Sequence, residues 1–317
     1  MNFFQTPFNY AGNKFKLLEK LFQHFPQQIN TLYEPFAGGM TVSYNFQNAK
    51  KYQCYDTNKY IIDLCNILKD TDTEKIYKDI EDIIISFGFS RTYIHSKEPY
   101  IASNIKLDKN GKQNTGLDEY NKEPYIKLRS SFNEMIVAEN YDTYKISLYF
   151  YVLLVHSYNY QFRFNSKGFF NMPNGRGDWN LKMQEKLFGF IKNIKQKDIS
   201  FHISDFKNFN FENIKKDDLV YLDPPYLIST ASYNENKGWT ENDEKELLSL
   251  TQKFIDKDIR FVLSNVIEHK DIKNILLKEF VEKNNLTLID MQHKYKSHGA
   301  KRKKTDAQTI EVIVKNF

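Results

Sequence analysis

The sequence predicts an α/β protein in which a doubly wound, mostly parallel sheet carries an inserted, mainly helical domain. Short apolar strand candidates alternate with helical periodicity at both ends of the chain, and such alternation is typical of parallel sheets covered on both faces. Residues 70–195 differ, because aromatic helical runs and polar, Gly/Asn-rich loops dominate there. We therefore expect a sheet-forming domain made of 1–69 and 196–317, with an insertion over 70–195.

The first 69 residues contain one βαβ unit. Apolar residues recur at helical spacing between Leu17 and Phe25 and predict a helix that ends at Pro26. The elements expected next are a strand at 31–34, the turn PFAGG at 35–39, a helix over 41–46 and a strand at 52–56.

The second half of the chain repeats this alternation. The expected elements are a helix at 181–194, strands at 200–204 and 219–222, a helix at 244–254, a strand at 260–264 and a helix at 271–282. Within the insertion we expect helices at 125–137 and 145–158, followed by a Gly/Asn-rich stretch at 165–178. Most aromatic residues at 149–160, together with His156, are expected in the core, because aromatic stripes at helical spacing usually pack.

Composition narrows the class of protein. The chain has 317 residues, 41% of them hydrophobic, with 45 Lys and Arg against 40 Asp and Glu. A chain of this size buries a core without disulfides, and Cys54 and Cys65 lack zinc or redox spacing. The longest apolar run, 146–155, is about half of a membrane span, and the N-terminus lacks a signal peptide's apolar region. We expect a cytoplasmic protein with no metal and no membrane association.

The turn after the first strand has features of a nucleoside-binding loop. Gly38 and Gly39 let the backbone approach a ligand, and Asp56 stands at the end of the next strand. In doubly wound folds, a carboxylate about 20 residues after the glycines accepts hydrogen bonds from ribose hydroxyls. The sequence has no third glycine and no Walker lysine, so a nucleoside fits better than a dinucleotide or a triphosphate. An ordinary turn with an exposed Asp stays open as the alternative.

A more specific motif, Asp223-Pro224-Pro225-Tyr226, directly follows the strand at 219–222. Consecutive prolines fix the backbone and have no N–H, so nearby carbonyl oxygens are available as acceptors. Asp223 and one such carbonyl suit the two N–H bonds of an exocyclic amine, and the Tyr226 ring suits a stacked base. A plain turn explains the prolines, but not the acid and the aromatic. The motif therefore indicates a site for a planar amine.

Several motifs in this order resemble those of the Dam-like (D12 class, α-group) DNA adenine N6-methyltransferases of restriction-modification systems. They are NYAGNK at 9–14, EPFAGG at 34–39, YDTN at 55–58, SDF at 204–206 and DPPY at 223–226. The family's DNA-contacting hairpin is resembled by residues 163–165 together with 168–175. A helix of its target-recognition domain is resembled by residues 125–134. Two departures are Tyr10, where members often carry Trp, and Asn13, where many have Gly.

The resemblance implies a Rossmann-like catalytic methyltransferase domain at 1–69 and 196–317, and a target-recognition, DNA-binding insertion at 70–195 with a hairpin near 163–176. It implies S-adenosyl-L-methionine as the methyl donor. The cofactor-binding positions it implies are Tyr10, Lys14, Phe36, Ala37, Gly38, Gly39, Asp56, Asp205, Phe206 and Asp223. The catalytic positions it implies are Asp223, Pro224, Pro225 and Tyr226.

The implied reaction is site-specific methyl transfer to the N6 amine of an adenine flipped out of double-stranded DNA. Loops carry contacts, and Arg grips phosphate or guanine. The residues expected to touch DNA are Arg163, Phe164, Asn165, Lys167 and Arg176. The basic stretch at 294–304 predicts sequence-independent phosphate affinity, although a solvated Lys-rich surface explains it equally well.

Alternatives remain at this point. The same pocket suits N4-methylation of cytosine, although Asp rather than Ser at position 223 favours adenine. A catalytically silent DNA-binding subunit is the alternative from a different class. A bacterial or phage monomer acting on double-stranded DNA is expected. The existence of a companion restriction endonuclease stays open, and no stable complex with one is expected.

Overall fold

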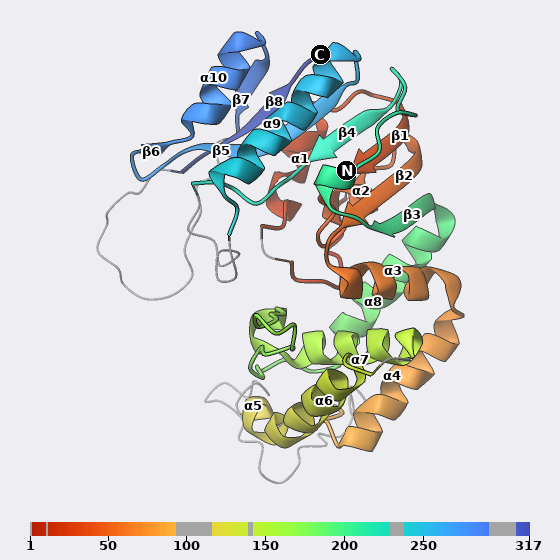
Figure 1. Cartoon of the computed structure of the whole chain (residues 1–317). Helices are drawn as coiled ribbons and strands as arrows, with labels where there is room; N and C mark the ends of the chain where they lie inside the picture. Colours follow the sequence, from red (N-terminus) through yellow and green to blue (C-terminus); the bar gives the residue numbers. More distant parts are fainter. Residues whose placement is uncertain (1, 11, 93–115, 139–141, 229–237, 292–308) are drawn as a thin grey trace. The chain divides into compact units, whose positions relative to one another are not determined.

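The computed structural model describes residues 2–10, 12–92, 116–138, 142–228, 238–291 and 309–317 (Figure 1). The chain divides into two compact units. The first consists of Met1–Phe4, Lys14–Thr57 and Lys197–Phe317, and the second of Gln5–Asn13 and Asn58–Gln196. The first unit is mixed α/β and contains the sheet, whereas the second is helical.

One sheet forms the centre of the first unit, in the order β3-β2-β1-β4-β5-β8-β7, with β6 paired to β5. The strands are β1 (Ile29–Glu34), β2 (Ala49–Asp56), β3 (Asp198–Ile203), β4 (Leu219–Leu222), β5 (Phe261–His269), β6 (Ile272–Lys273), β7 (Thr287–Asp290) and β8 (Thr309–Lys315). β1 to β5 are parallel, and β8 is antiparallel to both of its neighbours. The predicted α/β fold with a central, mostly parallel sheet is confirmed.

The strand order reverses at β1, which has β2 on one side and β4 on the other. Leu32 of β1 pairs with Leu219 of β4, and Glu34 at the end of β1 pairs with Cys54 of β2. In open α/β sheets, ligands bind beyond the carboxyl ends of the strands at such a reversal. The turn after β1 and the DPPY motif after β4 therefore leave adjacent strands at the edge where a site is expected.

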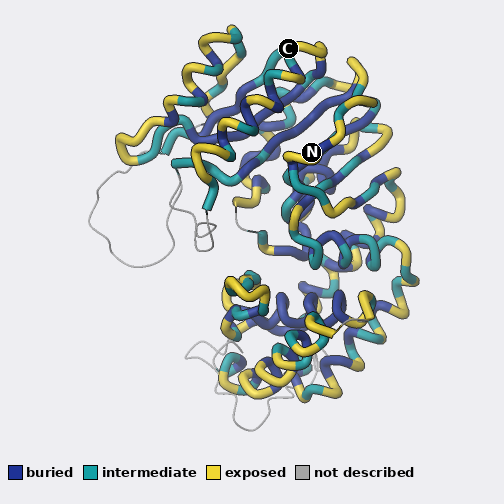
Figure 2. The backbone as a smooth tube through the Cα atoms, viewed as in Figure 1, coloured by how far each residue is buried: buried dark blue, intermediate teal, exposed yellow. Residues whose placement is uncertain are grey.

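Helices cover both faces of this sheet. They are α1 (Leu18–Phe22), α2 (Thr41–Asn45), α9 (Glu241–Asp256) and α10 (Ile275–Lys283), with the short 3-10 turns η1 (Phe15–Leu17) and η3 (Phe206–Asn208). On one face, Val220 of β4 and Phe261 of β5 share a buried cluster with Phe254 of α9. On the other face, the Phe25 ring lies 5.6 Å from the Tyr221 ring, centroid to centroid. Figure 2 shows the strands between these layers as largely buried.

The second unit is built around one buried helix. Its helices are α3 (Lys59–Asp70), α4 (Thr73–Phe87), α5 (Leu117–Tyr120), α6 (Lys122–Met135), α7 (Thr143–His156) and α8 (Leu181–Gln196), with the 3-10 turn η2 (Tyr158–Tyr160). Every residue from Ile146 to His156 is buried, and α7 packs against α3, α4 and α6. The prediction that this aromatic run and His156 are core residues is confirmed, although Tyr158 and Tyr160 are exposed.

The structure departs from the expected elements in several places, and the helices α3, α4 and α5 were not expected. α3 belongs to the second unit rather than ending the sheet domain at residue 70, because its buried apolar face contacts α7 and α8. The helix expected at 271–282 begins only at Ile275, where the Asn274 side chain accepts a hydrogen bond from the Leu277 N–H. β7 and β8 were not expected at all.

Two further observations concern charge and hydropathy. The basic stretch at 294–304 lies outside the described residues. Within the described ranges, no helix has the length and apolar character that a membrane span requires.

Candidate active site

Four side chains from three distant parts of the chain meet at the carboxyl end of β4. Lys14, just before η1, places its Nζ 2.8 Å from Asp223 Oδ1 and 3.6 Å from Oε1 of Glu311 on β8. The Tyr226 hydroxyl lies 3.2 Å from Asp223 Oδ1 and 3.0 Å from Glu311 Oε1. The Lys14 ammonium is also 5.0 Å from the centroid of the Tyr226 ring. We call Lys14, Asp223, Tyr226 and Glu311 the acidic cluster.

Burial and charge act against each other in the acidic cluster. Burial alone lowers the pKa of a lysine, but the carboxylates of Asp223 and Glu311 outweigh it, so the pKa of Lys14 is raised. Burial raises the pKa of Asp223; Lys14 opposes that rise and Glu311 adds to it. Burial also raises the pKa of Tyr226 well above its ordinary value. Lys14 therefore stays charged at neutral pH, and Tyr226 keeps its hydroxyl proton.

The two oxygens of Asp223 are used differently. Lys14 and Tyr226 both contact Oδ1, and no described residue donates a hydrogen bond to Oδ2. Pro224 is buried directly after it, and Pro225 follows; neither proline carries an N–H that would compete for the carboxylate. Lys14 and Tyr226 thus orient Asp223 through Oδ1. Oδ2 is the oxygen that can accept a hydrogen bond from a donor other than the described residues.

The glycine turn after β1 is hydrogen-bonded to the end of β2. The Gly38 N–H donates to Asp56 Oδ2 at 2.8 Å, and the Ala37 N–H donates to the Tyr55 carbonyl at 2.9 Å. Gly38 has a φ of 49°, in the left-handed region that favours glycine. Asp56 is 8% exposed, so its carboxylate is held in place beside the turn.

Three aromatic side chains gather beside this turn. The Phe36 ring, after β1, lies 5.1 Å from the Phe206 ring of η3, and the Trp239 ring lies 5.3 Å from Phe206 and 5.9 Å from Phe36. Asp205 is the N-cap of η3, and its side chain accepts a hydrogen bond from the Lys207 N–H. In the aromatic cluster of Phe36, Phe206 and Trp239, Phe36 and Phe206 thus follow the carboxyl ends of β1 and β3, and Trp239 comes from the segment before α9.

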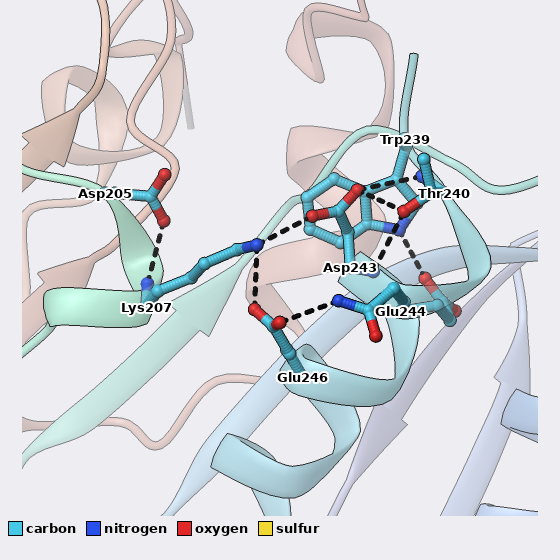
Figure 3. A network of polar contacts seen from close by, with 8 residues as sticks. Asp205, Lys207, Trp239, Thr240, Asp243, Glu244 and Glu246 are labelled. Atoms are coloured by element: carbon cyan, nitrogen blue, oxygen red, sulfur yellow. Dashed lines mark hydrogen bonds and ion pairs between the residues drawn. The ribbon is translucent and has the colours of Figure 1, made fainter. Parts of the chain in front are cut away.

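A polar network fixes Trp239 and joins η3 to α9 (Figure 3). The Trp239 Nε1–H donates to the buried Glu244 at 2.6 Å. The Lys207 ammonium bridges Asp243 at 2.9 Å and Glu246 at 2.8 Å. Hydrogen bonds, first from Thr240 and then from Lys207, lower the pKa of Asp243 to about 2. The segment that follows the DPPY loop is thus fastened to the segment that carries Phe206.

The stretch at 163–176 forms a hairpin turn in the second unit. Phe164 and Phe170 form an antiparallel bridge, and the side-chain oxygen of Asn165 accepts hydrogen bonds from the backbone N–H groups of Lys167 and Phe169, each at 3.0 Å. The Phe164 ring stacks on Tyr60 at 4.8 Å between centroids. Asn165 therefore shapes the turn, and Phe164 anchors it to the aromatic core of its unit.

The basic residues predicted to contact DNA have exposed side chains. Lys167 lies at the tip of the hairpin, while Arg163 donates from Nε to Asn171 Oδ1 at 2.9 Å. Arg176 lies 3.4 Å from Asp118. Their exposure is compatible with phosphate contacts, and their roles stay predictions.

The predicted site residues do not all share one unit. Tyr10 belongs to the second unit, where its ring packs 5.4 Å from Phe162, whereas the other predicted cofactor positions lie in the first. Sequence reasoning missed Glu311 and Trp239. Glu311 stands in the alternating apolar strand TIEVIVK, and Trp239 directly precedes the N-cap Thr240, so both carried only weak local signals.

Comparison with known proteins decides the family. The sequence pattern of the D12 class N6 adenine-specific DNA methyltransferases matches residues 10–297. The chain belongs to this family. The resemblance inferred from the motifs is therefore confirmed.

This D12-class chain is similar to several methylases. Over its full length it is 32% identical to the Type II methyltransferase M.FokI of Planomicrobium okeanokoites, and over 99% of its length it is 32% identical to the modification methylase StsI of Streptococcus sanguinis. It spans 43% of the length of each of these two proteins. It is also 24% identical to the DNA adenine methylase of Escherichia coli K12, over 94% of the chain and 91% of that protein.

Proposed function

We propose that this chain is a site-specific DNA methyltransferase that transfers a methyl group from S-adenosyl-L-methionine to the N6 amine of adenine in double-stranded DNA. The observation that carries this proposal is Asp223 at the strand-order reversal, oriented through Oδ1 and flanked by two prolines and Tyr226. Membership in the D12 class supports adenine as the base and N6 as the atom.

The residues beyond β1, β2 and β3 fit S-adenosylmethionine. The Gly38 N–H donates a hydrogen bond to the Asp56 carboxylate. In such folds a carboxylate at this place accepts hydrogen bonds from ribose hydroxyls. Phe36 and Phe206 offer aromatic surface for an adenine ring. When bound, the cofactor supplies an electrophilic methyl group on a sulfonium. Ala37 and Gly39 flank Gly38 in the turn, and Asp205 directly precedes Phe206.

Asp223 and the DPPY turn would act on the amine. The lone pair of adenine N6 is delocalised into the purine, which makes the amine a weak nucleophile. Asp223 Oδ2 and the Pro224 carbonyl accept the two N6–H bonds and favour a more tetrahedral nitrogen. Lys14 and Tyr226 hold the carboxylate through Oδ1. The N–C bond would form as the C–S bond breaks, and one N6 proton would leave to water afterwards, so positioning and electrostatics would supply most of the rate.

The second unit is proposed to recognise DNA. N6 is paired inside a duplex, so the target adenine must flip out, at a cost of a few kcal/mol. Stacking on Tyr226 and phosphate contacts from Arg163, Lys167 and Arg176 offset this cost. Phe164 and Asn165 support the hairpin through Tyr60 and the turn amides.

The biological setting is proposed from the printed names of the relatives. M.FokI is named a Type II methyltransferase and StsI a modification methylase. We propose a restriction-modification role for this chain as a cytoplasmic monomer in bacteria or phage, without a stable complex with any companion endonuclease. N4-methylation of cytosine and a silent DNA-binding subunit are outcomes that the following experiment separates.

Methyl transfer to DNA tests the proposal directly. Wild-type protein should move a labelled methyl group from S-adenosylmethionine to duplex DNA, and digestion to nucleosides should yield N6-methyladenine. Asp223→Ala should lower kcat by on the order of 100-fold or more, because it removes an acceptor that aligns the amine. Asp217→Ala, an exposed carboxylate before β4, is the matched control and should keep activity. N4-methylcytosine, or equal labelling by wild type and Asp223→Ala, would contradict the assignment.

A further inference from the structure

Glu311 belongs to none of the sequence motifs, yet it is built into the acidic cluster. It lies on β8, where it pairs with Val266 of β5 beside an irregularity in the register. Only 6% of the residue is exposed. A buried carboxylate is costly unless charged or hydrogen-bonding partners surround it, and here Lys14 and the Tyr226 hydroxyl do so.

The position of Glu311 gives the acidic cluster a second carboxylate. Lys14 is closer to Asp223, at 2.8 Å, than to Glu311, at 3.6 Å. Lys14 and Tyr226 contact Asp223 directly, whereas Glu311 contacts these two residues and not Asp223 itself. Its negative potential nevertheless reaches Asp223, since Glu311 contributes to the raised pKa of that carboxyl group. The same potential acts on any other charge that approaches Asp223.

The proposed reaction brings a positive charge to this place. Methyl transfer requires the donor sulfur to lie beside the amine, with the reacting atoms about 3–3.5 Å apart. The amine is held at Asp223, so the sulfonium of the cofactor must come close to the acidic cluster. The product, S-adenosylhomocysteine, differs only in having lost the methyl group and with it the charge on sulfur.

We propose that Glu311 is a specificity-determining residue that makes the site bind the sulfonium form of the cofactor in preference to its neutral thioether product. This inference rests on the proposed function. Glu311 acts through its charge and through the hydrogen bond that holds Tyr226. It thereby favours binding of a fresh cofactor and release of the spent one.

The substitution Glu311→Gln separates the charge from the hydrogen bond. Glutamine has almost the same shape and keeps an oxygen that accepts from the Tyr226 hydroxyl, but it carries no charge. Glu311→Asp does the reverse, since it keeps the charge on a shorter side chain. Glu268→Gln is a matched control, because Glu268 is a half-buried carboxylate on the neighbouring strand β5, opposite Ile310 of β8.

Calorimetric titration of the full chain tests the proposal with three ligands. They are S-adenosylmethionine, S-adenosylhomocysteine and sinefungin, in which an amine-bearing carbon replaces the methylsulfonium. Glu311→Gln should weaken the binding of S-adenosylmethionine and of sinefungin about tenfold relative to that of S-adenosylhomocysteine. This is the effect expected for loss of one nearby charge in a partly buried site. Glu268→Gln should leave the ratio of the dissociation constants unchanged.

The outcomes separate this inference from the proposed function. If wild-type protein binds and uses S-adenosylmethionine but Glu311→Gln leaves the ratio unchanged, the role of Glu311 is wrong and the function stands. If wild type binds none of the three ligands, the proposed function itself fails. If Glu311→Gln has lost S-adenosylhomocysteine binding as well, Glu311→Asp decides: retention of the wild-type preference supports the proposal, and its loss overturns it.

Discussion

The end of β4 and the hairpin at 163–176 are built in opposite ways. At the end of β4, Lys14, Asp223 and Glu311 arrive from three distant parts of the chain, and each contacts another member of the acidic cluster. In the hairpin, Asn165 bonds to amides only two and four residues away, and Lys167 projects from the turn exposed.

This difference separates two kinds of requirement. A reacting amine has to be held to within a fraction of an ångström, which needs side chains locked by long-range partners. A DNA-recognising loop needs a stable turn whose exposed side chains can be exchanged, because function is grafted onto folds through such loops. Substitutions in the acidic cluster should therefore impair chemistry, and substitutions in the hairpin should impair DNA binding alone.

Lys14→Met should give the largest effect. It leaves the half-buried Asp223 and the buried Glu311 close together without their ammonium, and breaking a buried pair costs about 3–5 kcal/mol. We expect kcat to fall by on the order of 100-fold or more. Since Lys14 lowers the pKa of Asp223 and the acceptor must be ionised, the acid limb of the pH–rate profile should also move to higher pH.

Lys16→Met is the control for that experiment, because Lys16 is exposed two residues away. Its kcat and pH profile should match wild type. An unshifted acid limb in Lys14→Met would show that Lys14 does not act through Asp223.

Local motifs predicted the elements of the site that are close in sequence. Gly38 and Asp56, and Asp223 and Tyr226, were found because each pair belongs to one strand end or one βαβ unit. Glu311 was missed because only the antiparallel pairing of β8 with β5 brings it to the site. Hydrophobic periodicity carries no information on such long-range pairing.

The second unit shows the same limit. The periodicity of α7 marked it as buried, but the start of the unit's longer segment at Asn58 depends on the packing of α3 against α7 and α8. Trp239 was missed for a related reason, since its partners Phe36 and Phe206 follow β1 and β3, far from it in the sequence. Tertiary contacts, rather than local propensity, set these features.

Glu34→Gln should change how stability depends on pH in the first unit. Burial raises the pKa of Glu34 to about 7, against the opposing hydrogen bonds from Ser43, whereas an unfolded glutamate titrates near ~4.3. The folded protein thus holds a proton that the unfolded chain releases between these values. Stability should fall by up to about 4 kcal/mol as the pH rises through this window.

Urea unfolding at pH 5 and pH 7.5 checks this expectation. Burial lowers the pKa of Lys197 to about 8, so its titration contributes little below that value. Glu34→Gln should remove most of the fall in stability, while Glu279→Gln on the exposed side of α10 should not. Parallel pH dependences in wild type and Glu34→Gln would show that Glu34 is ionised throughout.

Asn165→Ala should weaken DNA binding without affecting the cofactor. The substitution removes the two hydrogen bonds that the Asn165 side chain adds to the turn, worth about 1 kcal/mol each. We expect roughly tenfold weaker binding to duplex DNA in a fluorescence anisotropy titration. Asn210→Ala is a matched control, because Asn210 caps a similar turn in the first unit by accepting from the Glu212 N–H. Equal losses in both variants would deny the hairpin a specific role in DNA binding.

Lys167→Ala should give the smallest effect, and this effect should appear mainly in the salt dependence of DNA binding. The side chain is exposed at the hairpin tip, while the backbone N–H, which shapes the turn, is unchanged. Losing one phosphate contact lowers the slope of log affinity against log salt concentration by about 0.9, with a few-fold loss of affinity that is the same for specific and non-specific duplexes. Lys182→Ala, exposed on α8 of the same unit, should leave the slope unchanged. A loss confined to one DNA sequence would instead show that Lys167 contacts bases. The hairpin would then need an accurately placed side chain, as the acidic cluster does.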